Sequence, residues 1–285
     1  MNPTEETKLD TSAPRGEPLV RSIDRRNVPA GGCTAWWLGQ HGFVFKFAGA
    51  VCYVDAFLTP GPGRRVAPLL APRDVAHATL VLGSHDHSDH IDRPAWPGLA
   101  AASPGAVFVV PEALRTRVAR ELGLDPGRVR GVDVDRPLTV GGVTVHGVPA
   151  AHEFLDRDPA TGLHPYLGFV LEADGVALYH AGDTCLYEGI WSALRRWRLS
   201  AAFLPINGRD ARRLAAKCIG NMTYQEAADL AGALRPGLTV PTHFEMFASN
   251  SEDPKLFEDY MRVKYPALAV HVPRHGEPFD LATGR

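Results

Sequence analysis

A histidine-rich segment constrains this chain more than any other feature of its sequence. Of its 12 histidines, three fall within residues 85–90, together with two aspartates, directly after an apolar stretch. A packed core could not satisfy so many polar groups, whereas imidazole and carboxylate groups are good ligands for divalent metals. His85 and His87 can hold one ion, while Asp89 and His90 can turn toward a second. We interpret the segment as a metal site rather than a solvated polar loop.

One such segment cannot supply the ligands for two ions, so further ligands should lie where other strands end. Loops at one edge of a sheet converge in space. Three polar residues directly follow apolar, strand-like segments later in the chain, namely His152, Asp183 and His243. Each alone would be interpreted as a turn residue or a structural histidine. Together, in this order after the histidine-rich segment, they are predicted to complete the ligand set.

Short segments rich in Val, Leu, Phe and Tyr alternate with helical segments from residue 33 onward. Their boundaries at Gly, Pro or Asp are typical of strands. Strands are predicted at 34–38, 43–47, 51–55, 78–82, 106–110, 143–148, 169–172, 176–179, 201–205 and 238–241. Helices are predicted at 112–122, 188–198, 224–234 and 254–263, the third of them starting at the capping box Thr223-Tyr-Gln-Glu226.

The chain is predicted to form one domain over residues 31–285, preceded by a flexible N-terminal arm, residues 1–30, which is polar and lacks periodicity. A weak internal repeat aligns residues 42–53 with 168–179, with Gly, Phe, Val, Gly and Tyr at equal spacing. Two unrelated hairpins or two similar halves would both explain it. Mixed strands and helices in two halves predict an α/β (α+β) fold in which two sheets pack together with helices outside.

The ligand set and its order along the chain resemble the signature of metallo-β-lactamase-fold hydrolases. The matching positions are His85-x-His87-x-Asp89-His90, His152, Gly182-Asp183-Thr184 and His243. Asp55, at the end of a predicted strand, matches the signature's first aspartate, which is not a ligand. The resemblance covers residues 33–280. It implies a four-layer αββα sandwich of two similar halves, with a dinuclear metal site at one edge.

The resemblance also implies a role for each ligand. His85, His87 and His152 would hold the first divalent ion, Asp89, His90 and His243 the second, and Asp183 would bridge both. Two such ions share a water and lower its pKa, and Asp89 would relay the proton, so Asp89 and Asp183 are the expected catalytic residues. Because the donors are nitrogen and oxygen only, Mn²⁺, Zn²⁺ and iron all remain open. Asp55 and His180 are expected to lie behind the ligands.

A narrower resemblance, to the L-ascorbate-6-phosphate lactonase subfamily, rests on four further segments. These are residues 37–45 (WLGQHGFVF), 207–210 (NGRD), 220–231 (GNMTYQEAADLA) and 243–247 (HFEMF). The resemblance implies hydrolysis of a lactone, on a substrate like a phosphorylated sugar acid, and it favours manganese. Two alternatives stay open. One is a phosphodiesterase or phospholipase-D-like hydrolase on the same fold, and the other is a metal-binding protein without catalytic activity.

A local basic segment indicates where a small anionic substrate could bind. Residues 209–217 contain four cations and one aspartate, a local charge of +3 in a chain of net charge −2. Arginine can hold phosphate or carboxylate with two parallel hydrogen bonds, although a solvated helix face would have the same composition. Asn207 and Arg209, nearest the end of a predicted strand, are the predicted substrate contacts, with Gln40 facing the pocket from the first hairpin.

The overall composition excludes several partners. The near-neutral charge leaves no broad basic surface for nucleic acid or anionic lipid. No apolar run approaches the ~18 residues of a membrane span. The first residues lack the layout of a secretory signal, and four widely spaced cysteines predict free thiols, so a cytoplasmic protein is expected. Analogy with the lactonase subfamily favours a homo-oligomer. The four cysteines are Cys33, Cys52, Cys185 and Cys218.

Overall fold

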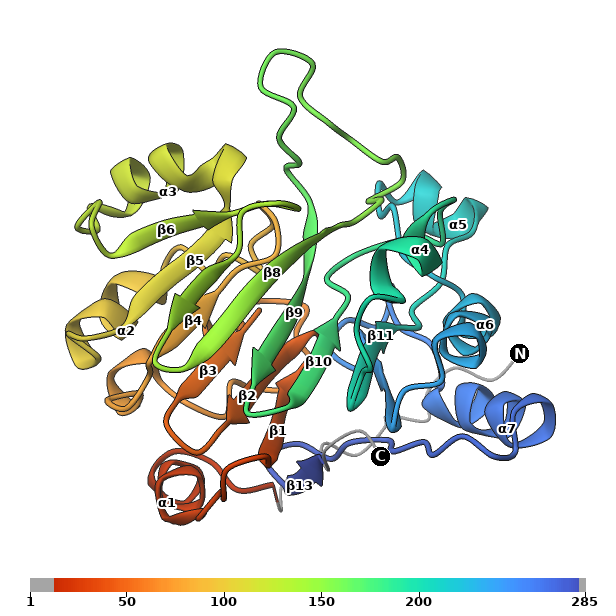
Figure 1. Cartoon of the computed structure of the whole chain (residues 1–285), viewed down its shortest axis with the longest axis horizontal. Helices are drawn as coiled ribbons and strands as arrows, with labels where there is room; N and C mark the ends of the chain where they lie inside the picture. Colours follow the sequence, from red (N-terminus) through yellow and green to blue (C-terminus); the bar gives the residue numbers. More distant parts are fainter. Residues whose placement is uncertain (1–12, 282–285) are drawn as a thin grey trace.

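Two mixed β-sheets lie face to face in this protein, and helices cover their outer sides (Figure 1). The computed structural model describes residues 13–281. The seven-stranded sheet has the order β13 (Pro278–Leu281), β1 (Cys33–Gly39), β2 (Gly42–Lys46), β3 (Val51–Val54), β4 (Leu80–Leu82), β5 (Val107–Pro111), β6 (Val129–Val132). The six-stranded sheet has the order β12 (Leu238–Thr242), β11 (Ala201–Pro205), β10 (Val176–His180), β9 (Leu167–Ala173), β8 (Val143–Pro149), β7 (Leu138–Val140).

The helices divide between the two sheets, which gives the four-layer α/β sandwich expected from the sequence. The seven-stranded sheet is covered by α1 (Glu17–Arg25), α2 (Trp96–Ala102) and α3 (Arg115–Leu122). The six-stranded sheet is covered by α4 (Ile190–Leu194), α6 (Tyr224–Leu234) and α7 (Pro254–Lys264), and the short helix α5 (Ala211–Ala215) lies beyond β11. Two 3₁₀ turns, η1 (Pro72–Asp74) and η2 (Glu112–Leu114), complete the elements.

Side chains alternate between two hydrophobic layers along the first strands. Trp37, Phe43 and Phe45 pack between the sheets, whereas Trp36 and Val44 pack under the outer helices. Since both faces of these strands are buried, their sequences read as continuous apolar runs. This pattern made the strands predictable.

The internal repeat corresponds to two hairpins of equal register. Val44 lies opposite Tyr53 in the β2–β3 pair, and Val170 lies opposite Tyr179 in the β9–β10 pair. In each half the second strand of the hairpin then pairs in parallel with the next strand, β3 with β4 and β10 with β11. This arrangement agrees with two similar halves.

The helix signals in the sequence were reliable at strong caps and unreliable elsewhere. At the start of α6, the Thr223 hydroxyl accepts from Glu226 N at 3.2 Å and the Glu226 carboxylate accepts from Thr223 N at 2.9 Å, as a capping box requires. The prediction of a helix over 188–198 was wrong in extent, since α4 covers only Ile190–Leu194. The strands β6, β7 and β13 and the helices α2 and α5 were not predicted.

The predicted flexible arm contains a packed helix, which corrects part of that prediction. Helix α1 occupies Glu17–Arg25, and its Leu19 and Ile23 are fully buried against the outer face of the seven-stranded sheet. The Lys46 ammonium also donates to the Ile23 carbonyl at 2.7 Å. With only two apolar residues facing the core, four positions apart, so short a helix gives little periodic signal. Residues 1–12 of the predicted arm lie outside the described residues.

Replacing Ile23 by alanine should test whether α1 is part of the folded unit. Ile23 is 0% exposed, so its truncation is expected to lower the free energy of unfolding by roughly 2–4 kcal/mol. Urea denaturation would measure the change. The matched control is Leu256→Ala on α7, where the side chain is 43% exposed and a change within about 0.5 kcal/mol is expected. Equal small effects at both positions would contradict the packed helix.

Candidate metal centre

The ends of five strands place the predicted ligands at one edge of the sandwich. Strands β3 and β4 are parallel, as are β10, β11 and β12. Strand β8 is antiparallel to β9, which is antiparallel to β10, so β8 runs in the direction of β10. The carboxyl ends of these strands therefore point the same way within each sheet. The loops that follow them carry Asp55, residues 85–90, His152, Asp183 and His243.

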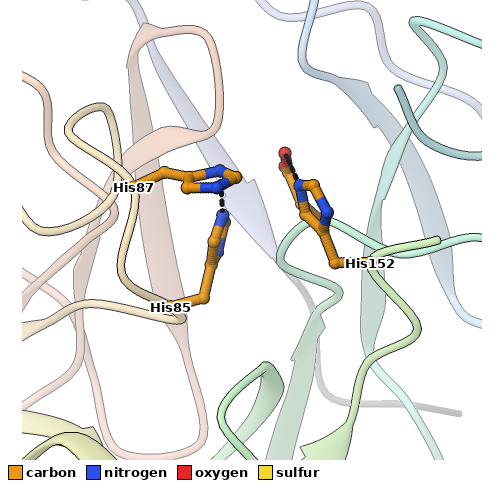
Figure 2. A group of neighbouring side chains, drawn as sticks. His85, His87 and His152 are labelled. Atoms are coloured by element: carbon orange, nitrogen blue, oxygen red, sulfur yellow. Dashed lines mark hydrogen bonds and ion pairs between the residues drawn. The ribbon is translucent and has the colours of Figure 1, made fainter. Parts of the chain in front are cut away.

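The first group of candidate ligands joins the two halves of the protein. It consists of His85, His87, His152 and Asp183, whose ligand atoms all lie within 4.8 Å of one another. His85 Nε2 lies 3.0 Å from His87 Nδ1, and His152 Nε2 lies 3.7 Å from Asp183 Oδ2. Figure 2 shows His85 and His87 on one loop and His152 approaching them from the opposite side.

The second group consists of Asp89, His90 and His243, within the same 4.8 Å limit. Asp89 Oδ2 lies 3.7 Å from His90 Nε2 and 4.0 Å from His243 Nε2. Asp183 connects the two groups, because its Oδ1 lies 3.4 Å from His90 Nε2 and 3.3 Å from His243 Nε2 while its Oδ2 faces His152. A single carboxylate thus contacts donors of both groups.

Buried polar atoms without hydrogen-bond partners fit a cation at this site. His90 Nε2 and Asp183 Oδ1 are both buried and neither makes a hydrogen bond, which is costly unless another group satisfies them. Burial lowers the pKa of His85 and of His152, so both rings are neutral and can donate a lone pair. A donor set of imidazole nitrogens and carboxylate oxygens suits divalent transition metals.

The charges around His90 also fit a bound cation. Burial disfavours the charged ring, yet the carboxylates of Asp183, Asp55 and Asp89 raise the pKa of His90 well above its ordinary value. The site therefore concentrates negative charge in a buried place, and a bound cation would offset it.

Asp55 lies behind the ligands and fixes the orientation of His90. Its carboxylate accepts hydrogen bonds from Ser84 N at 2.8 Å, from Ser84 Oγ at 2.7 Å and from His90 Nδ1 at 2.7 Å. Because Nδ1 keeps its proton in this hydrogen bond, Nε2 is the nitrogen that faces the second group and would give up its proton to bind an ion. Asp55 is fully buried and contacts no other candidate ligand at hydrogen-bond distance.

A reciprocal pair of hydrogen bonds ties the two halves together beside Asp183. His41 Nε2 donates to the Gly182 carbonyl at 2.7 Å, and His180 Nε2 donates to the His41 carbonyl at 2.8 Å. Gly182 has φ +60°, and a Cβ there would lie 2.6 Å from the Leu167 carbonyl oxygen. Only glycine fits this close approach, so the position of the backbone that carries Asp183 depends on Gly182.

Three site residues other than glycine adopt left-handed backbone conformations. They are Gln40 (φ +54°), Asp55 (φ +47°) and His243 (φ +60°). Such conformations cost on the order of 1–3 kcal/mol each and tend to gather at functional sites. Their coincidence here is a third sign, independent of residue type and charge, that this edge is the functional one.

Comparison with known proteins identifies the family. The profile of the Beta-lactamase superfamily domain matches residues 27–244. The chain belongs to the metallo-β-lactamase superfamily. It is 30% identical to a UPF0173 metal-dependent hydrolase of Opitutus terrae over 255 residues, covering 86% of this chain and 98% of the relative. A relative of the same description from Pyrococcus abyssi is 28% identical over 253 residues, with the same coverage of both chains.

A solved structure shows the same fold. The metallo hydrolase Igni18 from the hyperthermophilic archaeon Ignicoccus hospitalis superposes with a TM-score of 0.69 at 22% identity, covering 87% of this chain and 98% of that one. The two UPF0173 relatives are described as metal-dependent hydrolases, and the chain is accordingly a metal-dependent hydrolase of the metallo-β-lactamase superfamily. Their descriptions name no substrate.

The predicted substrate residues of this metallo-β-lactamase-fold protein lie in different surroundings. Gln40 is fully buried against the second group, with Nε2 3.1 Å from Asp89 Oδ2. Asn207 is also buried, and its amide donates to Asn250 Oδ1 at 2.6 Å. Arg209 is half exposed and forms two hydrogen bonds of 2.6 Å to the Glu226 carboxylate. Of the three, the structure brings only Gln40 into contact with candidate ligands.

Two features of the site were not predicted from the sequence. Tyr166, just before β9, stacks on His152 with ring centroids 5.1 Å apart and lies 5.5 Å from His85. No motif surrounds this tyrosine, so nothing in the local sequence indicated it. Asp86, although inside the histidine-rich segment, is turned away from the ligands and pairs with Arg93 and Arg117.

The remaining histidines and cysteines lie apart from the candidate ligands. Within residues 13–281, no group able to hold a metal includes His77, His146, His164, His271 or His275. The four cysteines are free, and Cys185, two residues after Asp183, is buried and belongs to neither group. In the same part of the chain no helix is long and apolar enough to cross a membrane.

Proposed function

We propose that this protein is a dinuclear metallohydrolase that opens the ring of a lactone on a small anionic substrate resembling a phosphorylated sugar acid. The observation that carries the dinuclear part is the position of Asp183. One of its oxygens lies within 3.4 Å of nitrogens in the second group, and the other faces His152 of the first. A carboxylate placed between two ligand groups is suited to bridging two ions.

The residues of the site would have different roles in hydrolysis. Bound Mn²⁺, Zn²⁺ or Fe²⁺ ions would supply a water of lowered pKa and polarise the carbonyl under attack. Asp183, with its side chain only 8% exposed, is placed to hold both groups together. Asp89, with 19% of its side chain exposed, is closer to solvent and is the better placed of the two carboxylates to accept and release a proton.

The lactone assignment rests on the resemblance of four sequence segments to the lactonase subfamily. Two of these segments, 207–210 and 243–247, follow β11 and β12 at the edge that carries the candidate ligands. Arg209 and the basic residues that follow it would lie beside an anionic group bound there. Glu226 takes two parallel hydrogen bonds of Arg209, so an anionic group there would bind to the remaining N–H groups of the guanidinium.

Removal of metal should abolish the activity reversibly. Protein dialysed against a chelator is expected to lose hydrolysis of sugar-acid lactones and to regain it with Mn²⁺ or Zn²⁺, with two ions per chain by metal analysis. His146→Gln serves as the control, because His146 pairs with Glu172 outside both groups. Metal-loaded protein that binds two ions but hydrolyses no lactone, ester or phosphodiester would favour the non-catalytic alternative.

A phospholipase-D-like activity is the second candidate, and one observation favours it. Phe154 and Leu155, two and three residues after His152, are 67% and 46% exposed. Exposed apolar side chains beside a polar site are suited to contact an acyl chain. Hydrolysis of phospholipid in mixed micelles in preference to soluble lactones, lost on Phe154→Ser, would support this alternative over the first.

A further inference from the structure

Gln40 occupies an unusual place in the turn between β1 and β2. Its side chain is 0% exposed, and its backbone has φ +54°, which a residue other than glycine adopts at a cost. Its carbonyl oxygen accepts two hydrogen bonds of 3.0 Å, from Trp37 Nε1 and from His243 N. These bonds connect the turn to His243, the candidate ligand that follows β12. They also direct the side-chain amide of Gln40 toward the second group.

The amide contacts two of the three candidate ligands of that group. Gln40 Nε2 lies 3.1 Å from Asp89 Oδ2 and 3.1 Å from His243 Nε2. Its Oε1 is buried and makes no hydrogen bond within the described residues. An amide oxygen buried without a partner is destabilising unless a donor or a cation satisfies it.

The present orientation of the amide competes with metal binding. The Nε2 lone pair of His243 cannot both accept a hydrogen bond from Gln40 and bind an ion. Rotation of the amide by half a turn exchanges its oxygen and nitrogen and leaves the shape of the side chain almost unchanged. The rotated amide would present Oε1 to the same place, where it could act as a ligand while leaving His243 free to bind.

We propose that the side-chain oxygen of Gln40 is an additional ligand of the second metal ion and that it makes this site prefer Mn²⁺ over Zn²⁺. The proposal rests on the dinuclear function above. Without Gln40 the second site has four protein donors, from Asp89, His90, His243 and the shared Asp183, and the water shared between the ions makes five, a number that zinc in catalytic sites accepts. The amide oxygen adds a sixth, neutral oxygen donor, and oxygen donors in a six-coordinate site suit manganese better.

The decisive experiment compares Gln40→Glu with Gln40→Leu. Binding of Mn²⁺ alone and of Zn²⁺ alone would be measured by competition with a chelator, together with the metal content. If Gln40 is a ligand, Glu keeps an oxygen and adds charge, so Mn²⁺ should bind more tightly, by about tenfold. Leu should weaken Mn²⁺ roughly 10–100-fold, the range for a lost supporting contact, and Zn²⁺ much less. Gln225→Glu, the same change on helix α6, is the control and should alter neither affinity.

A different result is expected if Gln40 is not a ligand. If the amide only donates a hydrogen bond to Asp89, Glu would repel that carboxylate and weaken Mn²⁺ and Zn²⁺ alike, which would overturn the proposal. Should the variants fail to fold, the absorption spectrum of the Co²⁺-loaded wild-type protein decides instead. The very weak bands of a six-coordinate ion support the proposal, and the stronger bands of four- or five-coordinate ions at both sites refute it. A wild-type protein that binds no second ion would instead refute the dinuclear function.

Discussion

Asp183→Asn is expected to lose tight binding of both metal ions and to lower metal-dependent hydrolysis by at least about 10³-fold, since the ions supply the activated water and the charge stabilisation. The carboxylate is 8% exposed, and it contacts His90 and His243 through Oδ1 and His152 through Oδ2. An asparagine has the same shape but only one oxygen and no charge. It therefore cannot accept from both groups, and its amide nitrogen would face a histidine.

Metal analysis of the purified variant is the direct measurement. His243→Ala should separate the groups, because it removes a donor of the second group only and should leave about one ion per chain. The matched control is Asp174→Asn, the same chemical change in the exposed turn between β9 and β10, which should retain both ions. A full complement of two ions in the Asp183 variant would defeat the bridging assignment.

The sequence predicted the site best where metal-binding residue types directly follow predicted strands. His85, His87 and His90 lie within one short segment, so their proximity follows from the chain itself. His152, Asp183 and His243 could be added because each follows an apolar strand, and parallel strands end at a common edge. In the structure His85, His87, His152 and Asp183 form one group and Asp89, His90 and His243 a neighbouring one, with Asp183 Oδ1 facing the second group.

The spacing of residues in the sequence does not predict which way each side chain of the site points. Asp86 and Asp89 are both acidic residues of one segment, yet Asp86 turns outward because Arg93 and Arg117 lie on that side. Gln40 reaches the second group only because the β1–β2 turn has a left-handed residue and is tied to His243. These contacts depend on tertiary packing, which no local spacing encodes.

Fold prediction failed where stability comes from packing rather than from local pattern. Helix α1 has only Leu19 and Ile23 facing the core, and strand β13 is an edge strand with a single buried residue, Leu281. By contrast, the central strands are buried on both faces and carry long apolar runs. The prediction of α4 was too long for the same reason. Apolar residues near 191 and 197 fit a helical pattern, but the helix ends at Leu194.

Asp55→Ala is expected to weaken both the fold and the metal site. The substitution removes the acceptor of three buried hydrogen bonds, from Ser84 N, Ser84 Oγ and His90 Nδ1. At ~1 kcal/mol or more for each bond to a charged acceptor, the free energy of unfolding should fall by roughly 3 kcal/mol. Alanine also tolerates the observed φ of +47° less well than aspartate does.

The change in metal affinity shows whether Asp55 orients His90 or only stabilises the fold. Without Asp55 the ring of His90 can rotate or place its proton on Nε2, so affinity for the second ion should fall about 10–100-fold. Metal affinity would be measured at a temperature where the variant is folded, with Ile23→Ala as a control that loses similar stability far from the site. If both variants bind the second ion as tightly as the wild-type protein, Asp55 supports the fold but does not orient His90. If only Asp55→Ala loses it, the aspartate that the family signature carries without ligating acts through the tautomer of a single histidine.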